Sequence, residues 1–240
     1  MCGRYAATAT TAELVSEFDI ELVESEAPEP NYNVAPTDPV AAVVERRPED
    51  RTTRKLVELR WGLVPSWSKD PRGGARMINA RAETVASKPA YRKAFAARRC
   101  LLPANGYYEW YITDQTGPRG KSVKQPFFIH PPAGERLVMA GLYEFWKDPE
   151  AAAGEGWLAT CTVITTRATD ALGHIHDRMP MLIPAANRDA WLDPELRDPD
   201  QAWALMEVGA DLTAHAVSTQ VNSVRNNGPA LIEPLATDEA

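Results

Sequence analysis

The sequence predicts an α+β fold, in which a single domain combines a largely antiparallel β-sheet with a few short helices. Short apolar runs typical of strands recur along most of the 240 residues. Helix-like segments are few and do not alternate regularly with these runs, which argues against a doubly wound fold. No internal repeat, low-complexity tract or long linker divides the chain. One domain over residues 1–240 is therefore expected, with ample length for a sizeable core.

The start of the chain combines an extended segment, one helix and polar connections. Residues 3–6 are expected to be extended. A helix is predicted over residues 10–20, because Thr10 and Glu13 have the spacing of a capping box ahead of an apolar face. The polar stretch 21–37 is predicted to be loop, since it holds too few apolar residues for a strand or helix.

The remainder of the chain contains most of the predicted strands. Apolar or alternating runs predict strands over residues 40–44, 55–61, 100–103, 106–111, 126–130, 137–146, 158–165 and 179–183. Short helical segments are predicted over residues 89–99, 168–172, 184–192 and 199–206. Residues 46–54 and 113–124 are predicted to be hairpin connections, residues 61–67 a loop broken by Pro and Gly, and the tail from about residue 214 is expected to be irregular.

Charge and cysteine content limit the partners and the compartment. The net charge of −7 argues against nucleic acid, but residues 51–125 hold 16 Lys and Arg against 5 Asp and Glu. This segment predicts an anionic partner, and charges that decorate solvated faces are the equal alternative. No apolar run approaches a membrane span, and no basic-then-apolar signal region is present. Three widely spaced cysteines form no disulfide framework, so a cytoplasmic, reducing compartment is expected.

The most reactive group is expected at the first residues, Met1-Cys2-Gly3-Arg4. Removal of Met1, which a small second residue favours, gives Cys2 a free α-amine beside its thiol. Such a 1,2-aminothiol condenses with an aldehyde to a Schiff base, and the sulfur then closes a thiazolidine ring. Roughly a tenth of an α-amine is neutral at pH 7, against well under a thousandth of a lysine. A frayed, inert terminus is the alternative.

Three further positions are candidates for the chemistry. Glu109 lies among aromatic residues, so burial would raise its pKa toward the range useful for acid–base catalysis, whereas an outward-facing strand position would leave it solvated. Asn79 could orient a carbonyl or cap a turn. His174 and His176 would share a face if extended; they could bind zinc with a cysteine, transfer a proton, or be structural.

Other side chains are candidates for contacts with an anionic polymer. Tryptophans stack on bases, although they more often pack in the core or at its rim. Arginines suit phosphates through their forked donors, although a solvated surface charge is the more common role. These candidates are Trp67, Trp110, Arg4, Arg76, Arg81 and Arg178. Cys100 and Cys161 lie in apolar runs and are expected to be buried.

Taken together, these segments resemble the SRAP (SOS response-associated peptidase) family. No single segment is decisive, but the matches follow the family's order over nearly the whole chain. They are residues 1–5, 31–36, 61–65, 78–83, 100–110, 126–128, 140–142, 176–180, 221–222 and 227–229. The resemblance implies a twisted, barrel-like β core with short flanking helices.

The resemblance also implies a function and roles for individual residues. Members of the family crosslink covalently to abasic sites in single-stranded DNA, which shields the site from strand breakage. By matched position, Cys2 is the nucleophile after autoproteolytic loss of Met1, Asn79 holds the sugar or the terminus, and Glu109 is the acid–base group. His176 assists sugar-ring opening and Schiff-base formation. Phosphates would be held by Arg4, Arg81 and Arg178, and Arg76 would lie on the DNA-binding surface. The DNA path would be bordered by Trp67 and Trp110. The site would be lined by Asn33 and Pro36.

The expected partners are single-stranded DNA with abasic sites and replication or repair proteins. The protein is expected to be a monomer that associates with the nucleoid after DNA damage. It is expected to need no cofactor or metal. Peptidase, hydrolase and lyase-type chemistry would all belong to this one site. Two other functions stay open: an N-terminal-cysteine hydrolase of the glutamine amidotransferase kind, with an oxyanion element at Asn105–Gly106, and a noncatalytic DNA-binding module. The first lacks the expected ammonia-accepting synthetase region.

Overall fold

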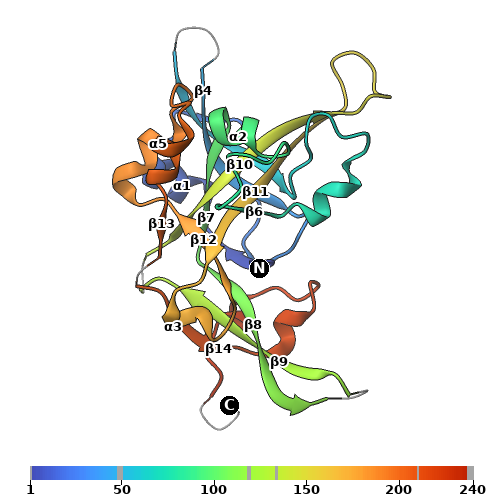
Figure 1. Cartoon of the computed structure of the whole chain (residues 1–240), viewed down its shortest axis with the longest axis vertical. Coiled ribbons are helices and arrows are strands. Elements are labelled where there is room, and N and C mark those ends of the chain that lie inside the picture. Colours follow the sequence, from blue (N-terminus) through green and yellow to red (C-terminus); the bar gives the residue numbers. More distant parts are fainter. Residues whose placement is uncertain (1, 48–50, 118–119, 133–134, 210, 237–240) are drawn as a thin grey trace.

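The predicted α+β class is confirmed by the computed structural model, which describes residues 2–47, 51–117, 120–132, 135–209 and 211–236, without the side chains of residues 170 and 171. The helices and helical turns are α1 (Thr11–Phe18), η1 (Pro71–Arg76), α2 (Arg92–Ala97), α3 (Asp170–Gly173), η3 (Ala185–Asn187), α4 (Arg188–Leu192), α5 (Pro199–Ala204), η4 (Thr219–Asn222) and η5 (Pro229–Leu231). Two β-sheets stand one above the other in Figure 1, with α1, α2 and α5 around the upper sheet and α3 beside the lower one. No helix in the described ranges is long and apolar enough to cross a membrane.

The larger sheet closes into a barrel, as the family resemblance implied. The ring consists of β4 (Pro39–Arg46), β5 (Thr53–Trp61), β11 (Trp157–Arg167), β10 (Leu137–Lys147) and β7 (Arg99–Ala104), each paired with the next and β7 with β4. Only the β5–β11 pair in this ring is parallel. The short strands β2 (Leu22–Val23), β6 (Asn79–Arg81), β12 (Arg178–Leu182) and β13 (Glu207–Val208) extend it. Apolar side chains that alternate along these strands fill the barrel, with Trp61 fully buried among them.

The smaller sheet is antiparallel, and its strand order is β14-β9-β8-β1-β3. Its strands are β1 (Tyr5–Ala7), β3 (Asn31–Val34), β8 (Gly106–Thr116), β9 (Ser122–His130) and β14 (Thr213–Ala216). The chain passes from barrel strand β7 to β8 through the single residue Asn105, so the two sheets meet at this point. The dark blue start of the chain lies between them in Figure 1. The N-terminal residues are therefore held at the junction of the two sheets.

Short strands appear where the sequence predicted none, at β2, β6 and β13 of the larger sheet and at both edges of the smaller one. Residues 31–34 form β3, which pairs with β1, and residues 213–216 form β14, which pairs with β9. Both predictions were wrong for the same reason: these are short edge strands, and backbone hydrogen bonds to a distant partner define them rather than an apolar run. The rest of the tail contains the turns η4 and η5 and is otherwise irregular.

Element boundaries also differ from the prediction, most clearly in two places. The helix expected over residues 89–99 is only α2, because Arg99 already belongs to β7. Its buried guanidinium donates hydrogen bonds to the carbonyls of Phe95, Trp191 and Asp193, which fixes it in the barrel wall. The hairpin arms β8 and β9 reach Thr116 and Ser122, well into the stretch predicted as connection. Residues 48–50 of the other predicted connection lie outside the described residues.

Candidate active site at the junction of the two sheets

Cys2 is fully buried and is not frayed. The next residues are fixed by β1, where Tyr5 pairs with Tyr107, and the Tyr108 N–H donates to the Arg4 carbonyl at 2.9 Å. The Asn79 side chain then holds the terminus itself, since its Nδ2 donates to the Cys2 carbonyl at 2.7 Å. Cys2 is therefore held in place rather than frayed, and the reactivity of the terminus stays a prediction. Met1 lies outside the described residues.

The position of Asn79 follows from the barrel. Strand β6 adds to β11 in parallel, with Asn79 opposite Val163, and the buried Trp61 indole donates to the Ile78 carbonyl at 3.0 Å. These contacts fix the backbone on both sides of the amide. Among the described residues no hydrogen-bond donor reaches the buried Asn79 Oδ1 atom, so this side chain has an acceptor to spare beside Cys2.

Glu109 and His176 form an acid–base pair next to this terminus. Glu109 lies on β8 with only 3% of its surface exposed, and burial raises its pKa to about 7. His176 Nε2 lies 3.8 Å from Glu109 Oε2. In the neutral form of His176, the Arg178 backbone N–H, which donates to Nδ1 at 3.0 Å, favours a proton on Nε2, whereas Asp177 Oδ1, 3.0 Å from the same Nδ1, favours a proton on Nδ1. Burial lowers the pKa of His176, which favours this neutral form.

The pair opens onto a pocket of about 370 Å³, lined by Glu109, Trp110, Lys124, His176 and Asn222. Lys124 lies on β9 opposite Ile112, and its charge lowers the pKa of both Glu109 and His176. Lys124 is not among the predicted site residues, because its position in the sequence suggested the tip of a hairpin. Had the strands β8 and β9 been predicted to continue toward the turn, their pairing would have indicated that Lys124 lies near Glu109. The burial of Cys2, together with the adjacent Glu109, raises the pKa of the thiol well above its ordinary value.

Arg4 and Asn33 join the smaller sheet to the C-terminal segment 217–232. Arg4 Nη1 donates to Asn33 Oδ1 at 2.6 Å and to the Val221 carbonyl at 2.9 Å, and its guanidinium lies 5.8 Å from the centre of the Trp110 ring. The buried Asn33 amide donates to three carbonyls of this segment, and Trp110 Nε1 donates to Asn222 Oδ1 at 2.7 Å. Asn33 thus has a structural role: it anchors the segment that carries the pocket residue Asn222.

Arg178 and Arg81 line a second cavity, of about 320 Å³. The Arg178 guanidinium forms a two-pronged ion pair with Glu83, at 2.6 and 3.1 Å, and also donates to the Thr165 carbonyl. Arg81 is exposed beside it, and Arg167 lines the same cavity. A phosphate on this surface would meet three guanidinium groups, one of which is already paired with a carboxylate.

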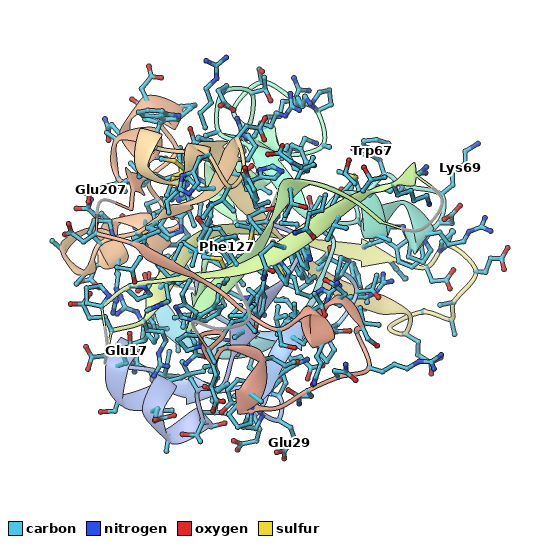
Figure 2. The ribbon with its side chains drawn as sticks, turned by 90° about the horizontal axis from the view of Figure 1, so that it is seen from below. Glu17, Glu29, Trp67, Lys69, Phe127 and Glu207 are labelled. Carbon is cyan, nitrogen blue, oxygen red and sulfur yellow. The ribbon has the colours of Figure 1, made fainter. Side chains whose placement is uncertain are left out.

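The remaining predicted contact residues lie outside these two cavities. Trp67 is 68% exposed on the loop after β5. Figure 2 shows Trp67 and Lys69 at one edge of the molecule, away from Phe127, the strand partner of Glu109. Arg76 is exposed at the end of η1, and Pro36 is half-buried in the turn after β3. The contacts of these residues with DNA stay a prediction.

Several alternative interpretations can be compared with the geometry. His174 is exposed in a turn, so it does not share an extended face with His176. In the part of the chain that the structure describes, no group of three or more His, Cys, Asp or Glu is arranged to hold a metal. The Asn105 N–H, proposed for an oxyanion element, already donates to the Ala6 carbonyl at 2.7 Å. Cys100 and Cys161 are fully buried, as expected.

Comparison with known proteins identifies the family of this chain. The family model described as SOS response associated peptidase (SRAP) matches residues 1–224. The chain is 39% identical over 237 residues to the abasic site processing protein YoqW of Bacillus subtilis (strain 168), covering 97% of this chain and 99% of that protein. It is 31% identical over 272 residues to the abasic site processing protein HMCES of Gallus gallus, covering 98% and 78%.

Solved structures show the same fold. A protein from Bacteroides thetaiotaomicron superimposes with a TM-score of 0.80 at 21% identity, covering 98% of this chain and 100% of the other. A protein from Bordetella bronchiseptica gives 0.67 at 26% identity, covering 90% and 100%. The ordered motifs, the barrel with its attached sheet and the family match over most of the chain lead to one conclusion: this chain belongs to the SOS response associated peptidase (SRAP) family.

Proposed function

We propose that this protein recognises abasic sites in single-stranded DNA and traps them as a thiazolidine on Cys2, after Met1 has been removed. One observation carries the proposal: the Cys2 carbonyl is held by Asn79 at 2.7 Å, beside a buried acid–base pair that opens onto a pocket. The names of the relatives, abasic site processing proteins, support the substrate.

The first step is hydrolysis of the Met1–Cys2 peptide bond. Water adds to the Met1 carbonyl carbon, the C–N bond breaks, and the departing nitrogen takes a proton to become the Cys2 α-amine. A group that both accepts and donates a proton near neutral pH is needed. Glu109, with a pKa of about 7, suits both halves of this step. The peptidase activity is thus directed at the protein's own N-terminus.

The second step captures the ring-opened sugar. The α-amine adds to the aldehyde carbon, and protonated Glu109 gives its proton to the departing hydroxyl, so that water leaves and a C=N bond remains. The nitrogen of this C=N bond still carries one hydrogen, as an iminium ion. The same carboxylate then takes the thiol proton, sulfur bonds to the iminium carbon, and the π electrons return to nitrogen, which becomes a neutral N–H as the ring closes. No oxidant is consumed. Because burial raises the pKa of the Cys2 thiol, this base is required at neutral pH.

The roles of His176 and Asn79 follow from their contacts. In the tautomer that the Arg178 N–H favours, neutral His176 carries its proton on Nε2 and can donate it to the ring oxygen of the sugar as the ring opens. Asn79 holds the Cys2 backbone through Nδ2, and its buried Oδ1 can accept a hydrogen bond from the new α-amine. This second contact would aim the nitrogen lone pair at the incoming aldehyde.

The DNA path would run over surfaces on either side of His176. Trp110 borders the pocket and offers an aromatic face, and the cavity at Arg81, Arg167 and Arg178 offers donors for phosphates. Aromatic faces between cationic grooves suit single strands with little sequence preference. The thiazolidine would keep the sugar from β-elimination and so protect the strand.

The test is the intact mass of the protein, before and after mixing with a single-stranded oligonucleotide that contains one abasic site. The expected product has the mass of the chain without Met1 plus the oligonucleotide minus one water, and it survives denaturation without a reductant. Cys2→Ala keeps an amine but no sulfur, so its adduct should be lost on denaturation. A stable adduct in that variant, or one on a chain that retains Met1, would overturn the proposal.

A further inference from the structure

The structure holds a pair of histidines remote in sequence from the residues used above. His130, at the end of β9, and His215, on β14, lie on one face of the smaller sheet, with Nε2 of the first 3.3 Å from Nδ1 of the second. Both side chains are half-buried. The His130 ring stacks on Phe128, with ring centres 5.5 Å apart, so one side of the pair is an apolar wall.

Two backbone carbonyls fix the protons of these rings. His130 Nδ1 lies 2.6 Å from the Pro131 carbonyl oxygen, and His215 Nε2 lies 2.8 Å from the Ile232 carbonyl oxygen. A carbonyl oxygen only accepts, so each of these nitrogens carries the proton of its neutral ring. The other two nitrogens therefore present lone pairs to each other. The Thr213 hydroxyl, 3.3 Å from His130 Nε2, can donate a hydrogen bond to that nitrogen. His215 Nδ1 then still has no donor, and its lone pair faces the lone pair of His130 Nε2.

A cation between the two nitrogens would resolve this conflict. Tetrahedral zinc with Zn–N bonds of roughly 2.0–2.1 Å places two imidazole nitrogens about 3.3 to 3.4 Å apart. The 3.3 Å between His130 Nε2 and His215 Nδ1 matches that edge. The carbonyl bonds on the far nitrogens are the outer contacts that orient histidines for a metal.

We propose that His130 and His215 form a binding site for a divalent transition metal of the zinc class. Water, with the Thr213 hydroxyl beside it, would complete the coordination. This inference does not depend on the proposed reaction at Cys2.

The site would act as a clamp on the C-terminal segment 217–232. The metal would join β9 to β14, and the His215 bond to the Ile232 carbonyl would extend the join to the end of that segment. The same segment supplies the Val221 carbonyl that binds Arg4 and the Asn222 side chain that binds Trp110. Metal binding would therefore slow the opening of one wall of the pocket.

The experiment uses the full chain and zinc alone. One Zn²⁺ should bind per chain, and at roughly 100 times the dissociation constant it should raise the melting temperature by about 5 to 10 °C, reversibly with a chelator. His130→Gln and His215→Gln should each abolish the shift. His174→Gln, which changes an exposed histidine in a turn, should keep it. No binding to the wild-type chain, or binding retained in both of the first two variants, would overturn the proposal.

A second measurement decides the matter should those variants fold poorly. In nitrogen-15 spectra of the wild-type imidazoles, zinc should move the His130 Nε2 and His215 Nδ1 signals and leave their partner nitrogens protonated. Backbone amides of residues 219–231 should also exchange more slowly with zinc bound. Zinc shifts confined to His174 or His176, as binding near Cys2 would give, would refute the site.

Discussion

A single buried carboxyl group sets the proton chemistry of the junction. Glu109 follows the buried Tyr107 and Tyr108 on β8, and only 3% of its surface is exposed. Burial disfavours the charged form and raises its pKa to about 7, so at neutral pH the acid and its conjugate base are both well populated. A residue in this state can act as acid and base in successive steps, as the proposed capture requires.

The raised pKa of Glu109 predicts a pH-dependent cost to stability. Between about pH 4.5 and 7 the folded chain keeps a proton that the unfolded chain has released, so this contribution to stability is lost as the pH rises through that window. Glu109→Gln removes the effect. Its free energy of unfolding relative to wild type should rise by about 1–3 kcal/mol between pH 5 and 7.5 in urea titrations.

The matched control for that experiment is Glu58→Gln, which neutralises an exposed carboxylate on β5. Its difference from wild type should change little over the same range. An equally flat Glu109→Gln curve would show that Glu109 titrates as an exposed carboxylate. In the crosslinking assay, Glu109→Gln should be slowed at every pH.

Asn79 predicts a separation of reaction rate from stability. Asn79→Ala removes the bond to the Cys2 carbonyl, and misplacement of a reacting group costs roughly 10- to 100-fold in rate. The initial rate of adduct formation should fall by that amount, with a loss of stability of only about 1 kcal/mol. Asn187→Ala, which removes a similar amide-to-carbonyl bond at Leu205, should leave the rate unchanged. Equal rates in the two variants would contradict the positioning role.

At the scale of elements, β3 fixes the C-terminal segment 217–232 through hydrogen bonds. The Asn33 side chain donates to the carbonyls of Val221, Ser223 and Asn226. Asn33→Ala would leave these acceptors without their donor, and we expect a loss of about 1–3 kcal/mol in stability. Hydrogen exchange should accelerate in residues 221–227 and stay unchanged around the Asn187–Leu205 contact. Uniform acceleration over the whole chain would instead indicate global destabilisation.

The elements that could be predicted from sequence are those whose signal is local. The strands β10 and β11 carry long apolar runs, which indicate a strand whatever the pairing partner is. Helix α1 carries its own capping box at Thr10. By contrast β3 and β14 depend on partners far away along the chain. Arg99 was assigned to a helix because its burial on three carbonyls is a tertiary property that no local pattern displays.

The same distinction applies to the site. Cys2, Asn79, Glu109 and His176 were selected from chemistry and from a resemblance in motif order, and the structure brings all four to one junction. Lys124 was missed because only the ladder between β8 and β9 carries it to the pocket. The Arg178–Glu83 ion pair also joins residues 95 positions apart, and no spacing rule predicts it.

At the scale of the molecule, positive and negative charges are concentrated in different parts of the chain. The whole chain carries −7, yet residues 51–125 hold 16 Lys and Arg against 5 Asp and Glu. That segment contributes Arg81, which lines the cavity at Arg178, and Lys124, which lines the pocket at His176. An acidic protein with a local cationic surface is repelled from intact duplex except where that surface engages. The DNA affinity then depends on how many of its cations are available for phosphates.

Glu83 is the residue through which this balance can be tested. Its carboxylate holds Arg178 in a two-pronged ion pair, and that guanidinium holds the pKa of Glu83 below its usual value. Glu83→Gln removes one negative charge and releases the competition for Arg178. We expect affinity for single-stranded DNA to rise by about 3- to 10-fold at low salt, with a salt dependence steeper by roughly 0.7 on a double-logarithmic plot.

Fluorescence anisotropy with an intact single strand at several salt concentrations measures this effect without the covalent step. Glu195→Gln provides the control, because it makes the same charge change at an exposed ion pair with Arg47, between α4 and α5. Its effect on affinity should be small and should follow net charge alone. Weaker binding by Glu83→Gln would mean that the ion pair is needed to hold Arg178 in place, and the cavity would then bind phosphate with the carboxylate still paired.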